Sequence, residues 1–84
     1  MYKVVFKESA IKDLEKVGAV YFNSVTAHIQ KLSNNPRPFG YKKLKGSENS
    51  YRIRVGVYRV VYTIKDDILV VEVIKIGHRR DVYR

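Results

Sequence analysis

The stretch 51–62 constrains this chain most, because it has the pattern of a β-hairpin that carries arginines on one face. Its first half alternates apolar residues with Arg52 and Arg54, as expected of a half-buried strand. If Gly56 begins a two-residue type II′ turn, Arg54 lies opposite Arg59, with Cβ atoms roughly 5 Å apart. Facing like charges destabilise a sheet, so the pair indicates either an anionic ligand or a solvated face with splayed side chains.

The N-terminal third predicts one strand followed by two helices. Residues 2–7 are rich in Tyr, Val and Phe and predict a strand at a sheet edge or paired with the C-terminal strands. Ser9 is the expected N-cap of the first helix, and Gly18 its expected end. Apolar residues at helical spacing predict the core-facing stripes of the two helices: Ala10, Ile11, Leu14 and Val17, then Phe22, Val25, Ile29 and Leu32.

The remainder predicts four antiparallel strands. Residues 41–45 form a short basic strand, the hairpin follows, and residues 68–76 are apolar on both faces, as in a central strand. A two-residue turn at Asp66 and Asp67 would place Glu72 opposite Val61 and diagonal to Arg59, where it would neutralise that arginine. The order β-α-α-β-β-β-β predicts a single α+β domain over residues 1–84, with the helical hairpin on one sheet face and the arginines on the other face or its rim.

The charge balance indicates a polyanionic partner. The chain has 17 Lys and Arg against 8 Asp and Glu, a formal charge of +9, and residues 37–84 hold 12 of the basic and 5 of the acidic residues. Without cysteine it has no disulfides and no thiolate metal site. Because it lacks an apolar run of signal-peptide or membrane-spanning length, we expect a soluble cytoplasmic protein with no membrane contact.

No familiar catalytic motif is present. The sequence lacks a Ser/His/Asp arrangement, an HExxH motif, a Gly-rich phosphate loop and the clustered carboxylates of metal-dependent nucleases, so we expect neither metal nor cofactor. What remains is a set of side chains suited to holding a phosphate and neutralising developing charge: Arg52, Arg54, Arg59, His78, Arg79 and Tyr83.

Three segments, 42–46, 51–62 and 76–83, together resemble toxins of type II toxin–antitoxin systems in the RelE/ParE superfamily, closest to the RelE branch. The resemblance covers nearly the whole chain. It implies a metal-independent endoribonuclease that cuts mRNA in the ribosomal A site and is silenced by a cognate antitoxin. It also implies that the antitoxin wraps an extended, acidic and amphipathic segment over the helices and sheet and displaces the C-terminal element.

The resemblance also assigns residues. The family's basic strand positions fall on Arg52 and Arg54, its second-strand arginine on Arg59, its post-strand arginine on Arg79 and its C-terminal tyrosine on Tyr83. The RelE type member has lysines at the first two of these positions. Arginine holds a phosphate by two parallel hydrogen bonds but is a far poorer proton acceptor, so a general-base role does not carry over to them.

The implied reaction is attack of an RNA 2′-OH on its own 3′ phosphate, which leaves a 2′,3′-cyclic phosphate and a 5′-OH. Arg54 and Arg59 would hold the phosphate, Arg79 would serve the leaving oxygen, and Tyr83 would stack on a base or orient the 2′-OH. The other basic residues assigned to RNA or ribosome binding are Lys42, Lys43, Lys45, His78 and Arg80.

Alternatives remain open at this stage. The lysines of segment 42–45 also suit an edge strand protected from aggregation, and His78 also suits a solvent-facing position. The ParE branch shares the fold and inhibits DNA gyrase without cutting RNA, although it generally lacks the arginine and tyrosine set. A non-catalytic RNA-binding module is the third possibility.

Overall fold

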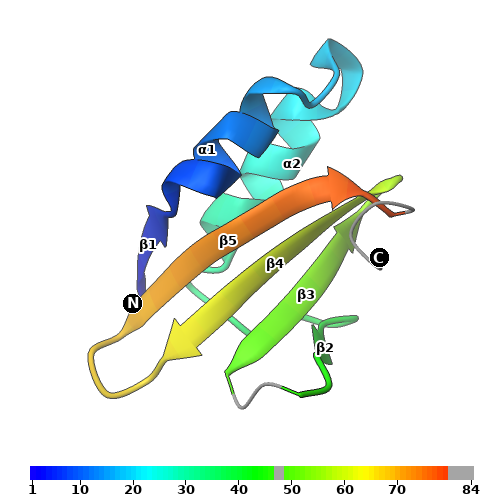
Figure 1. The fold of residues 1–84 in the computed structure, drawn as a ribbon. Coiled ribbons are helices and arrows are strands. Elements are labelled where there is room, and N and C mark those ends of the chain that lie inside the picture. The colour runs from blue at the N-terminus through cyan, green and yellow to red at the C-terminus, as the bar shows by residue number, and fades with distance from the viewer. Residues whose placement is uncertain (47–48, 80–84) are drawn as a thin grey trace.

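The computed structural model describes residues 1–46 and 49–79 of the chain. Figure 1 shows one strand, two helices and four further strands in chain order, as the sequence predicts. The elements are β1 (Lys3–Phe6), α1 (Glu8–Glu15), α2 (Ala19–Lys31), β2 (Lys42–Lys43), β3 (Ser50–Val55), β4 (Tyr58–Lys65) and β5 (Val70–His78). In the described part of the chain, neither helix has the length and apolar character needed to span a bilayer.

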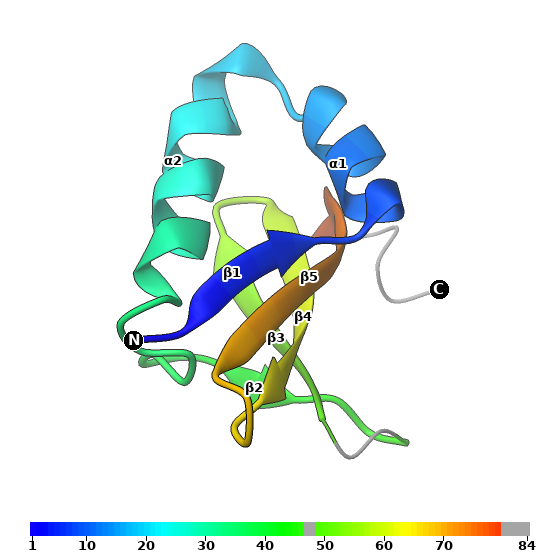
Figure 2. The same ribbon diagram turned by 90° about the vertical axis from the view of Figure 1, so that its left-hand side faces the viewer.

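The five strands form one mixed sheet in the order β1-β5-β4-β3-β2. Strands β2 to β5 pair antiparallel, and β1 pairs parallel with β5 at the edge nearest the viewer in Figure 2. The predicted α+β class is confirmed, including the first strand at an edge beside the last one. The predicted basic strand is confirmed but shorter, because only Lys42 and Lys43 pair with β3.

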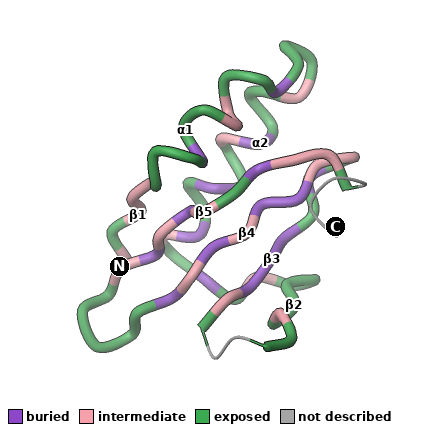
Figure 3. Tube along the Cα trace, viewed as in Figure 1, coloured by how far each residue is buried: buried purple, intermediate pink, exposed green. Residues whose placement is uncertain are grey.

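Both helices and one face of the sheet enclose a single hydrophobic core; Figure 3 shows all buried residues in purple, the core together with Arg52 and Arg59. Its largest fully buried side chains come from α2, the turn after it, β4 and β5: Val25, Ile29, Leu32, Val60, Tyr62, Val71 and Val73. The Tyr62 hydroxyl donates a hydrogen bond to the Pro36 carbonyl oxygen at 2.7 Å, which satisfies both buried groups. Burial raises the pKa of Tyr62, so the ring stays neutral.

The predicted apolar stripes of the helices are only partly correct. Ile11 on α1 is 49% exposed and Phe22 on α2 is 41% exposed, so neither is a core residue. The two short helices cover less of the sheet than a full apolar stripe on each would need, since most of the core comes from alternating strand positions.

Helix α1 covers the edge of β5 beyond the end of β1. The Ser9 hydroxyl donates to the Ile74 carbonyl at 2.9 Å, and the Ile76 amide donates to the Asp13 carboxylate at 3.0 Å. Ser9 is therefore not the N-cap, because Lys7 occupies that position and the hydroxyl satisfies a strand-edge carbonyl. Likewise, α1 ends at Glu15, and Gly18 precedes α2.

The connection from β4 to β5 is longer than predicted, which changes the position of Glu72. Residues 66–69 form the turn, with Leu69 at a φ of 53°, and Lys65 pairs with Val70. Glu72 consequently lies opposite Thr63. The prediction that Glu72 neutralises Arg59 is wrong, because a four-residue loop shifts the register by two residues at that point.

A β-bulge in β5 then re-aims the rest of that strand. Val73 pairs with Tyr62 but Lys75 pairs with Val61, so Ile74 is the extra residue. Before the bulge, Val73 is buried at an odd-numbered position; after it, Ile76 is buried and Lys75 is exposed. Without the bulge, the alternation would direct Lys75 toward the core.

Candidate functional site

The hairpin turn aligns two arginines across β3 and β4. Gly56 has a φ of 62°, the positive value that a type II′ turn requires at its first central residue. Val55 pairs with Tyr58, and Arg54 pairs with Arg59, as the sequence predicts. On its other side Arg59 faces Gly77 of β5, which adds no side chain to the row.

Arg79 joins this pair from a third segment of the chain. Its backbone N–H donates to the Val57 carbonyl at 2.8 Å, which ties the residue after β5 to the hairpin turn. Arg54, Arg59 and Arg79 then line one hollow of about 60 Å³ together with Gly56 and Tyr58, defined here as the arginine hollow. Three positive side chains from separate segments thus surround a space of phosphate size.

The burial of these arginines differs from the open cationic face that the sequence predicts. Arg54 is exposed, but Arg59 is 6% exposed and Arg52 only 3%. Both buried arginines interact with other groups of the chain. Since a guanidinium remains charged even when buried, Arg59 provides a fixed positive charge, whereas Arg54 and Arg79 reach solvent.

The other predicted site residues are dispersed. Lys42, Lys43 and Lys45 are exposed at the β2 edge of the sheet, on the opposite side of β3 from β4. His78 lies at the end of β5, opposite Tyr58, with ring centroids 6.3 Å apart. Two predicted site residues, Arg80 and Tyr83, lie outside the described residues.

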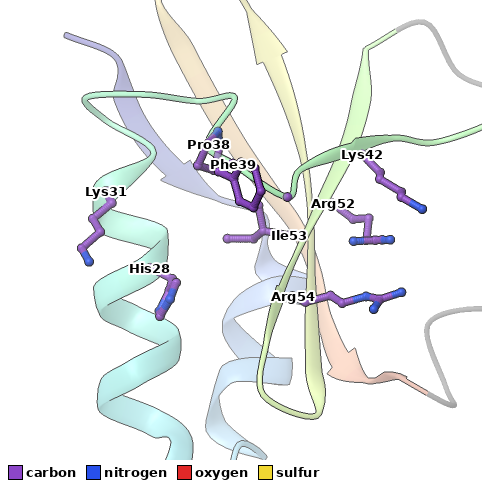
Figure 4. A pocket seen from close by; sticks show the side chains of 9 residues that line it. His28, Lys31, Pro38, Phe39, Lys42, Arg52, Ile53 and Arg54 are labelled. Atoms are coloured by element: carbon purple, nitrogen blue, oxygen red, sulfur yellow. The ribbon is translucent and has the colours of Figure 1, made fainter.

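A larger groove of about 340 Å³ lies between α2 and β3 and was missed from the sequence. Figure 4 shows Phe39 and Ile53 on the side of β3 that faces α2, while Arg52, Arg54 and Lys42 point to the other side. Phe39 is fully exposed. A phenylalanine between Pro38 and Gly40 in a turn-rich segment is the signal that could have indicated an exposed aromatic ring.

Arg37 anchors the loop that carries Phe39. Its guanidinium pairs with the Asp66 carboxylate at 2.8 Å, and the Tyr2 hydroxyl donates to the same carboxylate at 2.6 Å. Hydrogen bonds from Arg37 and then Tyr2 lower the pKa of Asp66, and the bond to Asp66 raises the pKa of Tyr2. Arg37 also lies over the Tyr51 ring, 5.6 Å from its centroid.

Comparison with known proteins identifies the family. The family model described as ParE toxin of type II toxin-antitoxin system, parDE, matches residues 4–83. The chain belongs to the RelE/ParE toxin superfamily. The toxin is 31% identical to the putative toxin RelE1 of Methanocaldococcus jannaschii, over 99% of this chain and 96% of that protein. It is also 31% identical to the mRNA interferase toxin RelE of Escherichia coli K12, over 93% of this chain and 83% of the relative.

Solved structures agree with this assignment. RelE in the intact E. coli RelBE toxin–antitoxin complex is 30% identical and superposes with a TM-score of 0.81, covering 93% of this toxin and 96% of that chain. The archaeal RelE–RelB complex from Pyrococcus horikoshii gives a TM-score of 0.82 at 26% identity, covering 95% and 97%. The predicted recognition of a RelE-like toxin is confirmed, and the same relatives support an antitoxin as its partner.

Proposed function

We propose that this toxin is an endoribonuclease that cleaves mRNA in the ribosomal A site and thereby inhibits translation in the cytoplasm. The observation that supports the proposal most directly is the arginine hollow, in which Arg54, Arg59 and Arg79 surround one small space. The relative from E. coli K12 carries the name mRNA interferase toxin RelE, which agrees with this activity.

The reaction requires no nucleophile from the protein. The RNA 2′-oxygen attacks the adjacent phosphorus and loses its proton, the bond from phosphorus to the 5′-oxygen breaks, and that oxygen takes up a proton. The products are a 2′,3′-cyclic phosphate and a 5′-OH. Arg54 and Arg59 hold the phosphate and stabilise its added charge, and Arg79 stabilises or protonates the leaving oxygen. The Tyr83 side chain stacks on a base or orients the 2′-OH.

The burial of Arg59 supports its role as a pre-organised charge. A guanidinium held in place by the fold needs little reorganisation when negative charge develops on the phosphate, and low-dielectric surroundings strengthen the attraction. Loss of one such contact costs on the order of 10²–10³ in rate. We therefore expect Arg59→Ala and Arg79→Ala to lower cleavage by about this factor each.

The test is cleavage of ribosome-bound mRNA by purified variants, with Arg37→Ala as an arginine control outside the hollow. Arg79→Ala alters an exposed side chain, so its fold is expected to remain intact, and Arg59→Lys keeps a charge at the buried position. Cleavage by Arg59→Ala or Arg79→Ala within a factor of a few of wild type, with native circular dichroism, would contradict the assigned roles.

Mapping transcript 5′ ends after induced expression separates the nuclease from its rivals. Codon-phased cuts within translated frames indicate the proposed activity. Intact mRNA accompanied by DNA damage would instead indicate gyrase inhibition, and RNA binding without new 5′ ends would indicate a non-catalytic module.

We further propose that Lys42, Lys43 and Lys45 dock on ribosomal RNA, with Arg80 adding to substrate binding and His78 assisting at the site. Arg52 is only 3% exposed, so it would add its positive charge to substrate binding without a direct phosphate contact. The exposed lysines at the β2 edge fit this role because phosphate contacts need accessible cations. Docking then weakens steeply with salt. An affinity for ribosomes that is independent of salt between 50 and 200 mM, or unchanged by removal of the three lysines, would eliminate this assignment.

The cognate antitoxin is proposed to wrap an acidic, amphipathic segment over this toxin. The groove of Figure 4 supports this chemistry, because exposed Phe39 lies on the side of β3 that faces His28 and Lys31 of α2, and the described lining contains no carboxylate. Phe39→Ala is expected to weaken antitoxin binding in a calorimetric titration, whereas Ile68→Ala, an exposed apolar residue elsewhere, serves as the control.

A further inference from the structure

A second polar hollow adjoins the arginine hollow. It has a volume of about 290 Å³ and lies between α1 and the end of β5, defined here as the lysine hollow. Its lining consists of Asp13, Lys16, Tyr58, Lys75, Ile76, Gly77 and His78. Tyr58 lines both hollows, so they share this side chain as part of their walls.

The lysine hollow is suited to negative charge. Lys16 approaches from α1 and Lys75 from β5, and both residues are exposed. The carboxylate in the lining belongs to Asp13, which already accepts the Ile76 amide at 3.0 Å and so serves the strand edge. Two lysines against one hydrogen-bonded carboxylate, next to three arginines, make a positive track on both sides of Tyr58.

The β-bulge and Gly77 determine which side chains β5 presents near the two hollows. The bulge directs Lys75 away from the core, and Gly77, which lines the lysine hollow, is the pairing partner of Arg59. Because glycine has no side chain, β5 places none beside Arg59 at this pairing position. β-Bulges frequently occur beside functional sites and re-aim side chains in this way.

The contacts around Tyr58 favour a phosphate ligand over a stacked base. Its ring meets Tyr21 edge-on at 5.4 Å and His78 edge-on at 6.3 Å, and its hydroxyl accepts the Gly18 amide at 3.3 Å. The ring is therefore engaged within the fold. Exposed lysines without a free aromatic face typically contact the RNA backbone and carry no base specificity.

We propose that the lysine hollow binds the phosphate backbone of the substrate RNA next to the scissile phosphate, with Lys16 and Lys75 as its two ligands. The RNA strand then runs from the arginine hollow past Tyr58 toward α1. This inference rests on the proposed ribonuclease function and extends it to a second, sequence-independent subsite.

The test uses a 2′-O-methyl decanucleotide, which lacks the attacking hydroxyl, and measures its binding by fluorescence anisotropy. The variant is Lys16→Ala/Lys75→Ala, and the matched control is Lys3→Ala/Lys65→Ala. The control removes the same charge from two exposed lysines that both pair with Val70, at the other end of β5 from the lysine hollow. Two lost phosphate contacts should lower the magnitude of the slope of log affinity against log salt by about 1.4, so two proteins of equal affinity at about 1 M salt would differ about 25-fold at about 0.1 M. The control variant should bind the decanucleotide with nearly the wild-type affinity and the wild-type salt dependence.

Several outcomes would overturn the inference. One is equal loss in both double variants, which indicates net charge alone, and another is unchanged affinity in Lys16→Ala/Lys75→Ala. A third is loss of affinity for a deca-glutamate peptide with RNA binding intact, which assigns the hollow to an acidic protein. Cleavage of ribosome-bound mRNA by the wild-type toxin is measured in parallel. Absence of cleavage would refute the proposed function, whereas cleavage without an effect of the Lys16→Ala/Lys75→Ala variant on RNA binding would refute only the second subsite.

Discussion

The turn that aligns Arg54 with Arg59 requires glycine at position 56 for two separate reasons, and Gly56→Ala tests both. The first is the positive φ of 62°, which costs an L-residue about 1–2 kcal/mol. The second is space, because an added Cβ would lie 3.0 Å from Cε1 and 3.3 Å from Cδ1 of Tyr21. The Tyr21 ring is held edge-on against Tyr58, so it yields only at a cost of about 1 kcal/mol. We expect a total destabilisation of about 2–3 kcal/mol.

Gly40→Ala is the matched control, because Gly40 also has a positive φ, 90°, but an added Cβ would meet nothing within 4 Å. It should therefore lose only the backbone term, about 1–2 kcal/mol. Urea unfolding followed by circular dichroism gives the free energies, and a cycle with Tyr21→Ala isolates the contact. Equal destabilisation by the two alanine substitutions, or no coupling between positions 56 and 21, would refute this reasoning.

Three further predictions concern other parts of the toxin. Tyr62→Phe leaves the buried Pro36 carbonyl without its hydrogen bond, so it should lower the unfolding free energy by about 1–2 kcal/mol in urea titrations while leaving RNA cleavage intact; an unchanged midpoint would contradict the role of this bond. The pKa of Asp66 is lowered in the fold, so its contribution to stability is present above its unfolded pKa of about 3.9 and is lost as the pH falls through the folded value. In acid titrations, the stability of Asp66→Asn should therefore depend less on pH below about pH 4 than that of the wild type. Identical curves would count against the ion pair with Arg37. Arg54→Lys retains the charge but not the paired donors, so ribosomal cleavage should fall less than in Arg54→Ala; equal losses would mean that charge alone is insufficient there.

The hairpin and its arginine pair could be predicted from the sequence because alternation and a single glycine fix the register locally. Arg54 opposite Arg59 follows directly from the turn at Gly56. The position of Arg79 beside them depends on a contact with the Val57 carbonyl, which no local pattern indicates.

The wrong position of Glu72 originates in the turn before β5. A four-residue turn moved Glu72 away from Arg59, and the bulge that directs Lys75 outward was not anticipated from the sequence; both features depend on the pairing of the whole sheet. The burial of Arg52 and Arg59 also could not be inferred from alternation, since alternation identifies the face of a strand but not what covers that face. Sequence reasoning likewise missed the groove beside Phe39, because it is assembled from α2, a loop and a strand edge.

The pairing of β1 with β5 determines when the arginine hollow can assemble during translation. The N-terminal strand is synthesised first, yet its partner in the sheet is the last strand to be made. Arg79, which follows β5, completes the arginine cluster only after that partner has been translated. A nascent chain that has not reached residue 79 therefore lacks the assembled arginine hollow, so the proposed cleavage site forms only after all five strands of the sheet have been translated.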